Sequence, residues 1–141
     1  MSKTIDLSFD GYWREVNVGG VPNDSGIYLV YVCTYNQNEK NVSIRKLIYI
    51  GETEKVRERI QNHEKKEECW DKKLNSGEVL CFSFAPVQSP DRERAEAALI
   101  FKHKPECNEE YVNNFPYEET SVNSKGKCTF INPSFTVHKT Q

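Results

Sequence analysis

Two segments rich in β-branched and aromatic residues, separated by a short polar stretch, constrain the fold of this chain most strongly. Residues 26–35, GIYLVYVCTY, predict a strand buried on both faces. Residues 42–50, VSIRKLIYI, predict a second strand, and residues 36–41, NQNEKN, form a polar turn between the two. Period-two counting divides the second strand into two faces, Val42, Ile44, Ile48 and Ile50 on one and Leu47 and Tyr49 on the other. We therefore expect an antiparallel hairpin.

The pattern after this hairpin predicts two helices and one further core strand. Gly51 is expected to end the second strand, and Thr53 to cap a helix over residues 54–65. A strand follows over residues 79–87, and Ser89-Pro90-Asp91 starts a helix over residues 90–103. Shorter strands are expected at residues 12–18, 127–131 and 134–137. The core order β-β-α-β-α predicts an α+β fold with a small, mostly antiparallel sheet flanked by helices.

Length and charge limit the function classes. A chain of 141 residues is expected to form a single domain, 1–141. With 19 Lys and Arg against 21 Asp and Glu, the net charge is −2, which argues against a protein that coats nucleic acid through a strongly basic surface. Any nucleic-acid binding must then use a local patch. No run of 18 apolar residues exists, so no membrane span is expected, and no secretory signal is visible near Met1.

The cysteines are five in number and include no CxxC pair. An odd count without close pairs is not typical of a disulfide framework or a zinc knuckle. The set His63, Cys69 and Cys81 also fits no zinc spacing. We therefore expect all five thiols to be reduced and the protein to be intracellular, in the cytoplasm.

Two tripeptides mark the ends of the predicted hairpin strands: Gly26-Ile27-Tyr28 opens the first and Tyr49-Ile50-Gly51 closes the second. Arg59 follows eight residues after that glycine, and His63 comes four residues later. Further on come Glu96-Ala97-Ala98-Leu99-Ile100 and Lys104-Pro105-Glu106-Cys107-Asn108. In this order the chain resembles the GIY-YIG nuclease family. The resemblance covers residues 25–108, which leaves an N-terminal extension, 1–24, and a C-terminal extension, 109–141.

The resemblance implies a metal-dependent endonuclease that hydrolyses DNA and leaves a 3′-hydroxyl and a 5′-phosphate. It implies Mg²⁺ or Mn²⁺ as the cofactor, held by Glu96, and DNA, branched or nicked forms included, as the partner. The expected catalytic residues are Tyr28, Tyr49, Arg59, His63, Glu96 and Asn108, and the expected substrate contacts are Gly51, Lys46 and Lys55. A catalytically silent module that recognises DNA structure is the alternative.

The residue types themselves agree with this chemistry. Phosphodiester hydrolysis needs a base for water, charge neutralisation at phosphorus and help for the leaving oxygen. Arg59 offers a planar fork of donors for a phosphate, and a lone carboxylate such as Glu96 suits Mg²⁺, which keeps several waters. Tyr28 or Tyr49 is the candidate base, because a nearby arginine and metal favour a phenolate.

Each of these residues also has a purely structural interpretation. The tyrosines are then core aromatics, Arg59 and His63 belong to a solvated helix face, Glu96 pairs with Arg92, and Asn108 is a turn residue. The stretch that contains Lys40, Arg45 and Lys46 is either a long hairpin arm or a DNA-contacting extension. The charged run around Trp70 is more typical of a solvated face than of a base-stacking platform.

Overall fold

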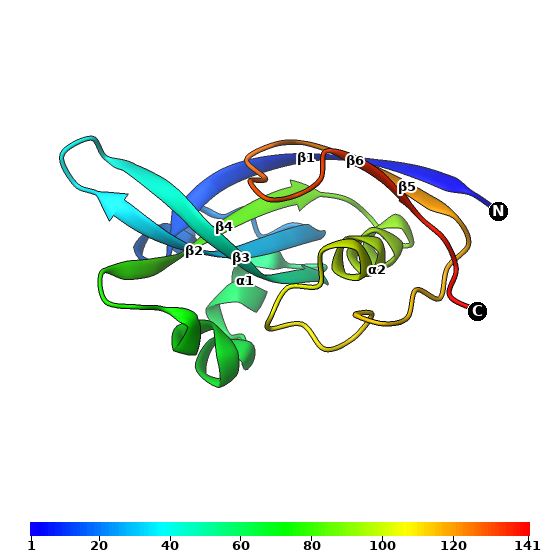
Figure 1. The fold of residues 1–141 in the computed structure, drawn as a ribbon. Helices are drawn as coiled ribbons and strands as arrows, with labels where there is room; N and C mark the ends of the chain where they lie inside the picture. The colour runs from blue at the N-terminus through cyan, green and yellow to red at the C-terminus, as the bar shows by residue number, and fades with distance from the viewer.

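The computed structural model describes residues 1–141, which form one six-stranded sheet and two α-helices (Figure 1). The strands are β1 (Lys3–Arg14), β2 (Gly26–Asn36), β3 (Asn41–Thr53), β4 (Glu78–Pro86), β5 (Thr120–Gly126) and β6 (Ser134–Val137), and the helices are α1 (Val56–Gln61) and α2 (Asp91–His103). The sheet order is β3-β2-β4-β1-β5-β6. Only the β1–β5 pair is parallel. The predicted α+β class and mostly antiparallel sheet are confirmed.

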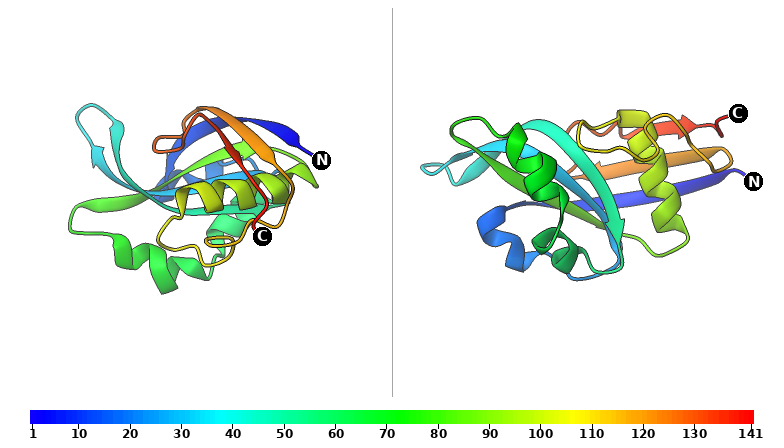
Figure 2. Two further views of the ribbon diagram at one scale, coloured as in Figure 1. Left: turned by 45° about the vertical axis from the view of Figure 1, so that its right-hand side comes forward. Right: turned by 90° about the horizontal axis from the view of Figure 1, so that it is seen from below.

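The curled sheet buries a separate apolar cluster on each face. Helix α2 packs on one face, where its Ala95, Ala98 and Leu99 meet apolar side chains of β1 and β2. The other face carries α1 and Trp70, which pack on β2 and β4 (Figure 2). Strand β2 lies in the interior of the sheet, and its first eight residues are buried, as its sequence predicts. Strand β3 is an edge strand.

Two register shifts interrupt the hairpin between β2 and β3. Val30 lies opposite Tyr49 and Tyr31 opposite Leu47, so Ile48 has no partner in the ladder. The extra residue turns Ile48 toward the α1 face, whereas Leu47 packs with the α2 face. The period-two assignment of Ile48 and Leu47 is therefore wrong, because a bulge changes the alternation along the strand.

The terminal segments differ from the expectation. The strand expected at residues 12–18 is wrong, because β1 begins at Lys3, alternates buried Ile5, Leu7 and Phe9 with exposed residues, and ends at Arg14. A 3-10 turn over Glu15–Gly20 follows it. Residues 127–131 form a turn rather than a strand, β5 precedes them, and β6 confirms the strand expected at 134–137.

Helix α1 is shorter than residues 54–65 predict, because β3 continues past Gly51 to Thr53 and the helix ends at Gln61. The side-chain amide of Asn62 donates to the Glu58 carbonyl at 3.1 Å and competes with the next helical turn. His63 therefore lies beyond the helix and not on one helical face with Arg59. A π-helical turn, Lys66–Trp70, follows.

The expectation of five reduced cysteines is wrong. Cys33 in β2 is bonded to Cys81 in the neighbouring strand β4, and Cys69 is bonded to Cys107, which leaves Cys128 free. The partners are 48 and 38 residues apart, so sequence spacing did not reveal them. The cysteines therefore give no support to an intracellular location. None of the helices has the length and hydropathy of a membrane span.

Candidate active site

The hairpin brings the two tripeptides together. In the antiparallel register Tyr28 lies opposite Gly51, and Tyr49 lies opposite Val30, two residue pairs further along. The Tyr28 and Tyr49 rings are tilted against each other with centroids 6.2 Å apart. Tyr28 is buried and Tyr49 is half-buried, so only the second ring reaches the surface to any extent.

Gly51 and Gly26 are required by close approach. A Cβ atom on Gly51 would lie 2.2 Å from Tyr28 Cζ and 2.3 Å from its hydroxyl. A Cβ atom on Gly26 would lie 2.2 Å from the carbonyl oxygen of Ala85 in β4. Any side chain at Gly51 would displace the Tyr28 phenol, so this glycine sets the position of a candidate catalytic group. A substrate contact at Gly51 stays a prediction.

His63 is the hydrogen-bond partner of Tyr28. Its Nε2 lies 2.8 Å from the Tyr28 hydroxyl, and the Lys65 backbone N–H donates to its Nδ1 at 3.1 Å. Because Nδ1 accepts, we assign the neutral tautomer with the proton on Nε2, which donates to Tyr28. The His63 ring also packs against the ring of buried Trp70, with the two ring centroids 4.5 Å apart. Burial, with Arg59 adding to it, lowers the pKa of His63 to about 4.

The two phenols are held protonated in the free protein. Burial raises the pKa of Tyr28 far above its ordinary value, and it raises the pKa of Tyr49 to about 12. The carboxylate of Glu96 raises both pKa values further, whereas the positive charge of Arg59 lowers both. Both tyrosines therefore lie within electrostatic range of Arg59 and of Glu96, although the four residues come from four different elements.

Arg59, on α1, is held by Glu64. Its Nη1 and Nη2 donate to the two carboxylate oxygens of Glu64, each at 2.8 Å. The Arg59 side chain keeps 34% of its surface exposed. It lines an open hollow of about 320 Å³ together with Thr53, Glu54, Lys55, Glu58 and Asn62. An arginine fork at an open hollow is suited to a phosphate.

Glu96, on α2, is a half-buried carboxyl without a basic partner. Burial, then the nearby Glu52 and Glu110 carboxylates, raises the pKa of Glu96 to about 8. The alternative in which Glu96 pairs with Arg92 is wrong, because Arg92 Nε donates to Glu52 at 2.6 Å and Nη1 donates to Ser25 at 2.7 Å. A carboxyl among acids, with no counter-charge, has the donor chemistry that fits a divalent cation.

No group of three His, Cys, Asp or Glu side chains in the chain is arranged to hold a metal ion. Glu96 would then act as a single protein ligand, with water completing the coordination. That arrangement is typical of Mg²⁺, which gives up its waters reluctantly. The residues present therefore fit a hydrated divalent cation at Glu96.

Asn108 completes the exposed edge of the sheet. Its Oδ1 accepts from the Ile50 N–H at 3.0 Å, and its Nδ2 donates to the Ile50 carbonyl at 2.9 Å. The Cys107 N–H donates to the Ile48 carbonyl at 2.9 Å. These bonds satisfy backbone groups of edge strand β3 at Ile50, within the Tyr49-Ile50-Gly51 tripeptide, and at Ile48, just before it. The side-chain amide of Asn108 is thus engaged with the backbone that carries Tyr49.

The two expected substrate lysines differ in their surroundings. Lys55 is exposed and lines the hollow beside Arg59. Lys46 lies further toward the hairpin tip, opposite Val32, where its ammonium pairs with Glu106 at 2.9 Å. Both lysines lie near a carboxylate, since Lys55 Nζ is 3.9 Å from Glu58, but only Lys55 lines the hollow of Arg59.

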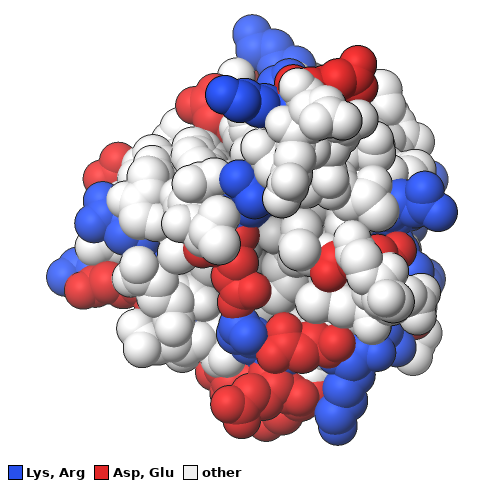
Figure 3. Space-filling model, turned by 90° about the vertical axis from the view of Figure 1, so that its left-hand side faces the viewer, with Lys and Arg blue, Asp and Glu red and all other residues white.

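The charged run 64–73 is a solvated mixed face, as the sequence favoured. Trp70 is buried, so it offers no stacking platform, and Lys66 and Lys73 pair with Asp71 and Glu106. Figure 3, turned to view the molecule from the side of the hairpin tip, shows acidic and basic side chains interleaved. Sequence reasoning missed Glu64 and Trp70 as neighbours of the site, since the run carries no periodic signal.

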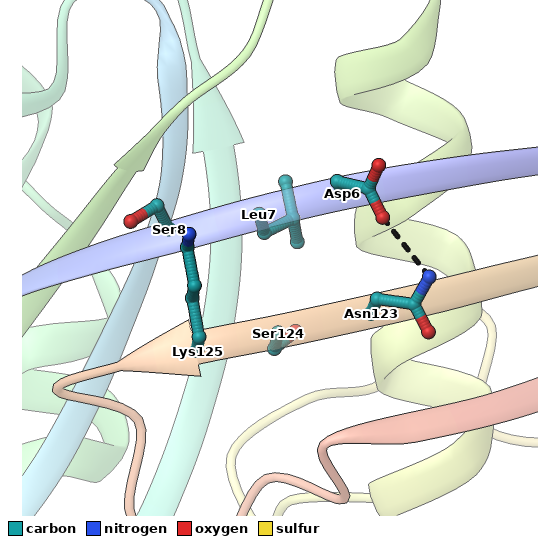
Figure 4. Close-up of a pocket in the computed structure, with 6 residues that line it drawn as sticks. All are labelled: Asp6, Leu7, Ser8, Asn123, Ser124 and Lys125. Atoms are coloured by element: carbon teal, nitrogen blue, oxygen red, sulfur yellow. Dashed lines mark hydrogen bonds between the residues drawn. The ribbon is translucent and has the colours of Figure 1, made fainter.

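A second hollow, of about 300 Å³, lies on β1 and β5, away from these residues (Figure 4). Its lining includes Asp6 and Asn123, which are hydrogen bonded at 2.9 Å. None of the expected site residues lines it. The candidate chemistry is therefore confined to the region where β2, β3, α1 and α2 meet.

Comparison with known families extends this picture. The model of the GIY-YIG catalytic domain matches residues 25–111, which is more than half of the chain. Comparisons with curated proteins and with solved structures gave no match. The matched range contains both tripeptides, Arg59, His63, Glu96 and Asn108. The chain therefore belongs to the GIY-YIG family, whose catalytic domain is of the nuclease type.

Proposed function

We propose that this protein is a metal-dependent endonuclease that hydrolyses DNA. One observation carries the proposal: Tyr28, hydrogen bonded to His63 at 2.8 Å, lies beside the Tyr49 ring, and both phenols are within electrostatic range of Arg59 and Glu96. Phosphodiester hydrolysis requires a base and positive charge near the phosphate. The two phenols and the His63 donor supply the first, and the Arg59 guanidinium, with a cation at the Glu96 carboxyl, supplies the second. Membership of a nuclease family supports the same reaction class.

Arg59 binds the scissile phosphate. Its fork of N–H donors matches two phosphate oxygens, as it now matches the two oxygens of Glu64. A phosphate that binds in the hollow of Arg59 therefore takes the place of Glu64. Arg59 loses two hydrogen bonds to that carboxylate and gains two to the substrate. The transition state gains most from this contact, because negative charge on the phosphoryl oxygens increases there.

Once its own hydroxyl proton has passed to solvent, Tyr28 accepts the proton of the attacking water as a phenolate. The Nε2–H of His63 donates to the Tyr28 oxygen, and a donated hydrogen bond stabilises a phenolate more than a phenol. The charge of Arg59 acts in the same direction. His63 is thus a donor to the base and not itself the base, and Tyr49, which is more exposed, orients the water or the phosphate.

Glu96 would hold the metal ion. A hydrated Mg²⁺ or Mn²⁺ supplies positive charge at the phosphate and at the leaving oxygen. Within the protein, Glu96 needs a cation to be ionised near neutral pH, because its pKa is raised to about 8. The same lack of a basic partner that makes Glu96 costly in the free protein suits it to this role.

A cleavage assay tests the proposal. The substrates are a supercoiled plasmid and a branched duplex. The wild type is assayed in Mg²⁺, in Mn²⁺ and in EDTA, and the variants Glu96→Gln and Glu93→Gln are assayed in Mg²⁺. We expect the wild type to cleave only when metal is present. Glu96→Gln should lose cleavage while its DNA affinity and melting temperature stay near those of the wild type. Glu93→Gln, one turn earlier on α2, should keep its activity. Wild-type cleavage rates in Glu96→Gln would contradict the metal assignment. A wild type that binds DNA but cuts in neither metal would indicate the silent binding module instead.

A further inference from the structure

A basic hollow lies between the end of β1 and the tip of the β2–β3 hairpin. It holds about 390 Å³, and the basic side chains that line it are Arg14, Lys40 and Lys127. Tyr12 and Tyr35 also line it, together with two asparagines. No Asp or Glu belongs to its lining. The chain has a net charge of −2, yet three basic side chains and no acidic one line this hollow. That composition favours the binding of an anion.

The three cations of the basic hollow have no carboxylate and no hydrogen-bond acceptor as a partner in the protein. Of the 19 Lys and Arg side chains, 12 pair with a carboxylate or donate a hydrogen bond. The remaining seven are Arg14, Lys40, Arg45, Lys72, Lys102, Lys125 and Lys127. Three of these seven meet in this one hollow. They have every donor available for a ligand.

Aromatic contacts hold two residues that line the basic hollow, Arg14 and Tyr12, in place. The guanidinium carbon of Arg14 lies 3.6 Å above the centre of the Tyr35 ring, which orients the arginine without using its N–H groups. Tyr12 packs edge-on against Tyr31, with centroids 5.4 Å apart, and its hydroxyl bonds to Thr129 at 2.6 Å. The site is therefore arranged before any ligand binds.

The basic hollow and the Tyr28–His63 pair lie on opposite faces of the sheet. Tyr35 and Tyr28 are seven residues apart in β2, an odd number, so their side chains point to opposite faces about 23 Å apart along the strand. The packing agrees, since Tyr12 packs with the α2 cluster and Tyr28 with the α1 cluster. Figure 1 shows the hairpin tip rising on the side of the sheet away from α1.

We propose that the basic hollow binds the phosphate backbone of a second arm of the DNA substrate. The inference rests on the proposed function, which makes DNA the ligand of Arg59. A backbone that reaches both Arg59 and the other face of the sheet belongs to a branched duplex, whereas one straight duplex follows a single face. Lys40 and Lys127 neutralise phosphates, and Arg14 adds a fork of donors.

Binding in EDTA, where the proposed metal is removed, tests this inference. The variant Arg14→Gln/Lys40→Gln/Lys127→Gln is compared with Lys72→Gln/Lys102→Gln/Lys125→Gln, which removes the same charge from three unpaired cations elsewhere. The ligands are a three-way junction and a linear duplex of the same length and arm sequence. Each affinity is measured between about 50 and 200 mM salt, the range over which counterion release is large.

We expect the hollow variant to weaken junction binding at least about tenfold at the lower salt, and the linear duplex little. The slope of log affinity against log salt for the junction should fall by about 2–3, from three lost phosphate contacts at roughly 0.9 each. Equal losses on both ligands, or equal losses in the two variants, would overturn the inference. This experiment measures binding and not cleavage, so its result does not depend on nuclease activity. If the wild type prefers the junction in this way but cuts no DNA in the cleavage assay, only the proposed function is contradicted.

Discussion

Both terminal nitrogens of Arg59 donate to Glu64, Nη1 to Oε2 and Nη2 to Oε1, each at 2.8 Å. The carboxylate therefore occupies the donor fork in the geometry that a phosphate would use. Glu64 lowers the freedom of the Arg59 side chain, and it also competes with the substrate for it. This relationship makes the roles of the two residues separable by substitution.

Arg59→Ala is expected to lower the cleavage rate by ~10²–10³, the effect of removing one strong electrostatic donor at a transition state. Arg59→Lys should recover little of this, because a point charge does not replace a two-pronged fork. Single-turnover cleavage at saturating enzyme measures the chemical step. Full activity in Arg59→Lys would show that the residue only steers DNA by its charge.

Glu64→Gln is expected to tighten DNA binding roughly two- to fivefold, since one exposed ion pair contributes about 0.4–1 kcal/mol. The amide still contacts the guanidinium but no longer competes as an anion. Glu118→Gln is the matched control, because Glu118 is exposed, pairs with Lys139 at 3.7 Å and does not line the hollow of Arg59. The measurement is an affinity in EDTA, and an equal gain in both variants would mean that net charge alone is responsible.

Tyr28→Phe and Tyr49→Phe are each expected to lower the rate of the chemical step by at least ~10², since Phe removes the hydroxyl and keeps the ring. The two losses should combine non-additively, because the phenols act on one water. Single-turnover rates of both variants and of the double variant provide the test, with thermal melts to check folding. Normal rates in both single variants would identify the tyrosines as core aromatics.

Gly51→Ala is expected to destabilise the protein by about 1–3 kcal/mol, the usual range for overpacking, and to reduce cleavage strongly. The new methyl group would lie 2.2 Å from Tyr28 Cζ, so the phenol must move. Gly19→Ala is the control, because a Cβ there has no atom within 4 Å. Urea unfolding and cleavage are measured on both, and wild-type behaviour of Gly51→Ala would contradict the close contact.

His63 should make stability depend on pH. Its pKa is about 4 in the folded protein and 6.5 when unperturbed, so between these values the unfolded chain binds the proton and the folded protein does not. The free energy of unfolding therefore falls as the pH drops from 6.5 to 4, by at most about 1.4 kcal/mol per pH unit from this group. His63→Gln should remove this part of the slope in urea unfolding. His138→Gln, at an exposed histidine, should keep it, and an unchanged slope in His63→Gln would refute the assignment.

Local sequence patterns were enough to predict the hairpin, the helix that begins after Ser89-Pro90 and the order of the candidate site residues. These depend on local patterns: β-branched runs for β2 and β3, a proline and an acid at the start of α2, and tripeptides whose spacing is read directly. Strand β1 was missed although Ile5, Leu7 and Phe9 alternate with polar residues. Its partner β5 lies 117 residues away along the chain, as the pair Ile5 and Val122 shows.

The tertiary structure alone decided which groups face one another. Arg92 binds Glu52 rather than Glu96, His63 donates to Tyr28 from beyond the end of α1, and a bulge moves Ile48 to the other face of β3. Each of these depends on side chains that come from different elements, whose distances no local pattern encodes. A carboxyl such as Glu96 is left without a counter-charge only when the whole chain has folded, because its burial and its acidic neighbours arise from packing.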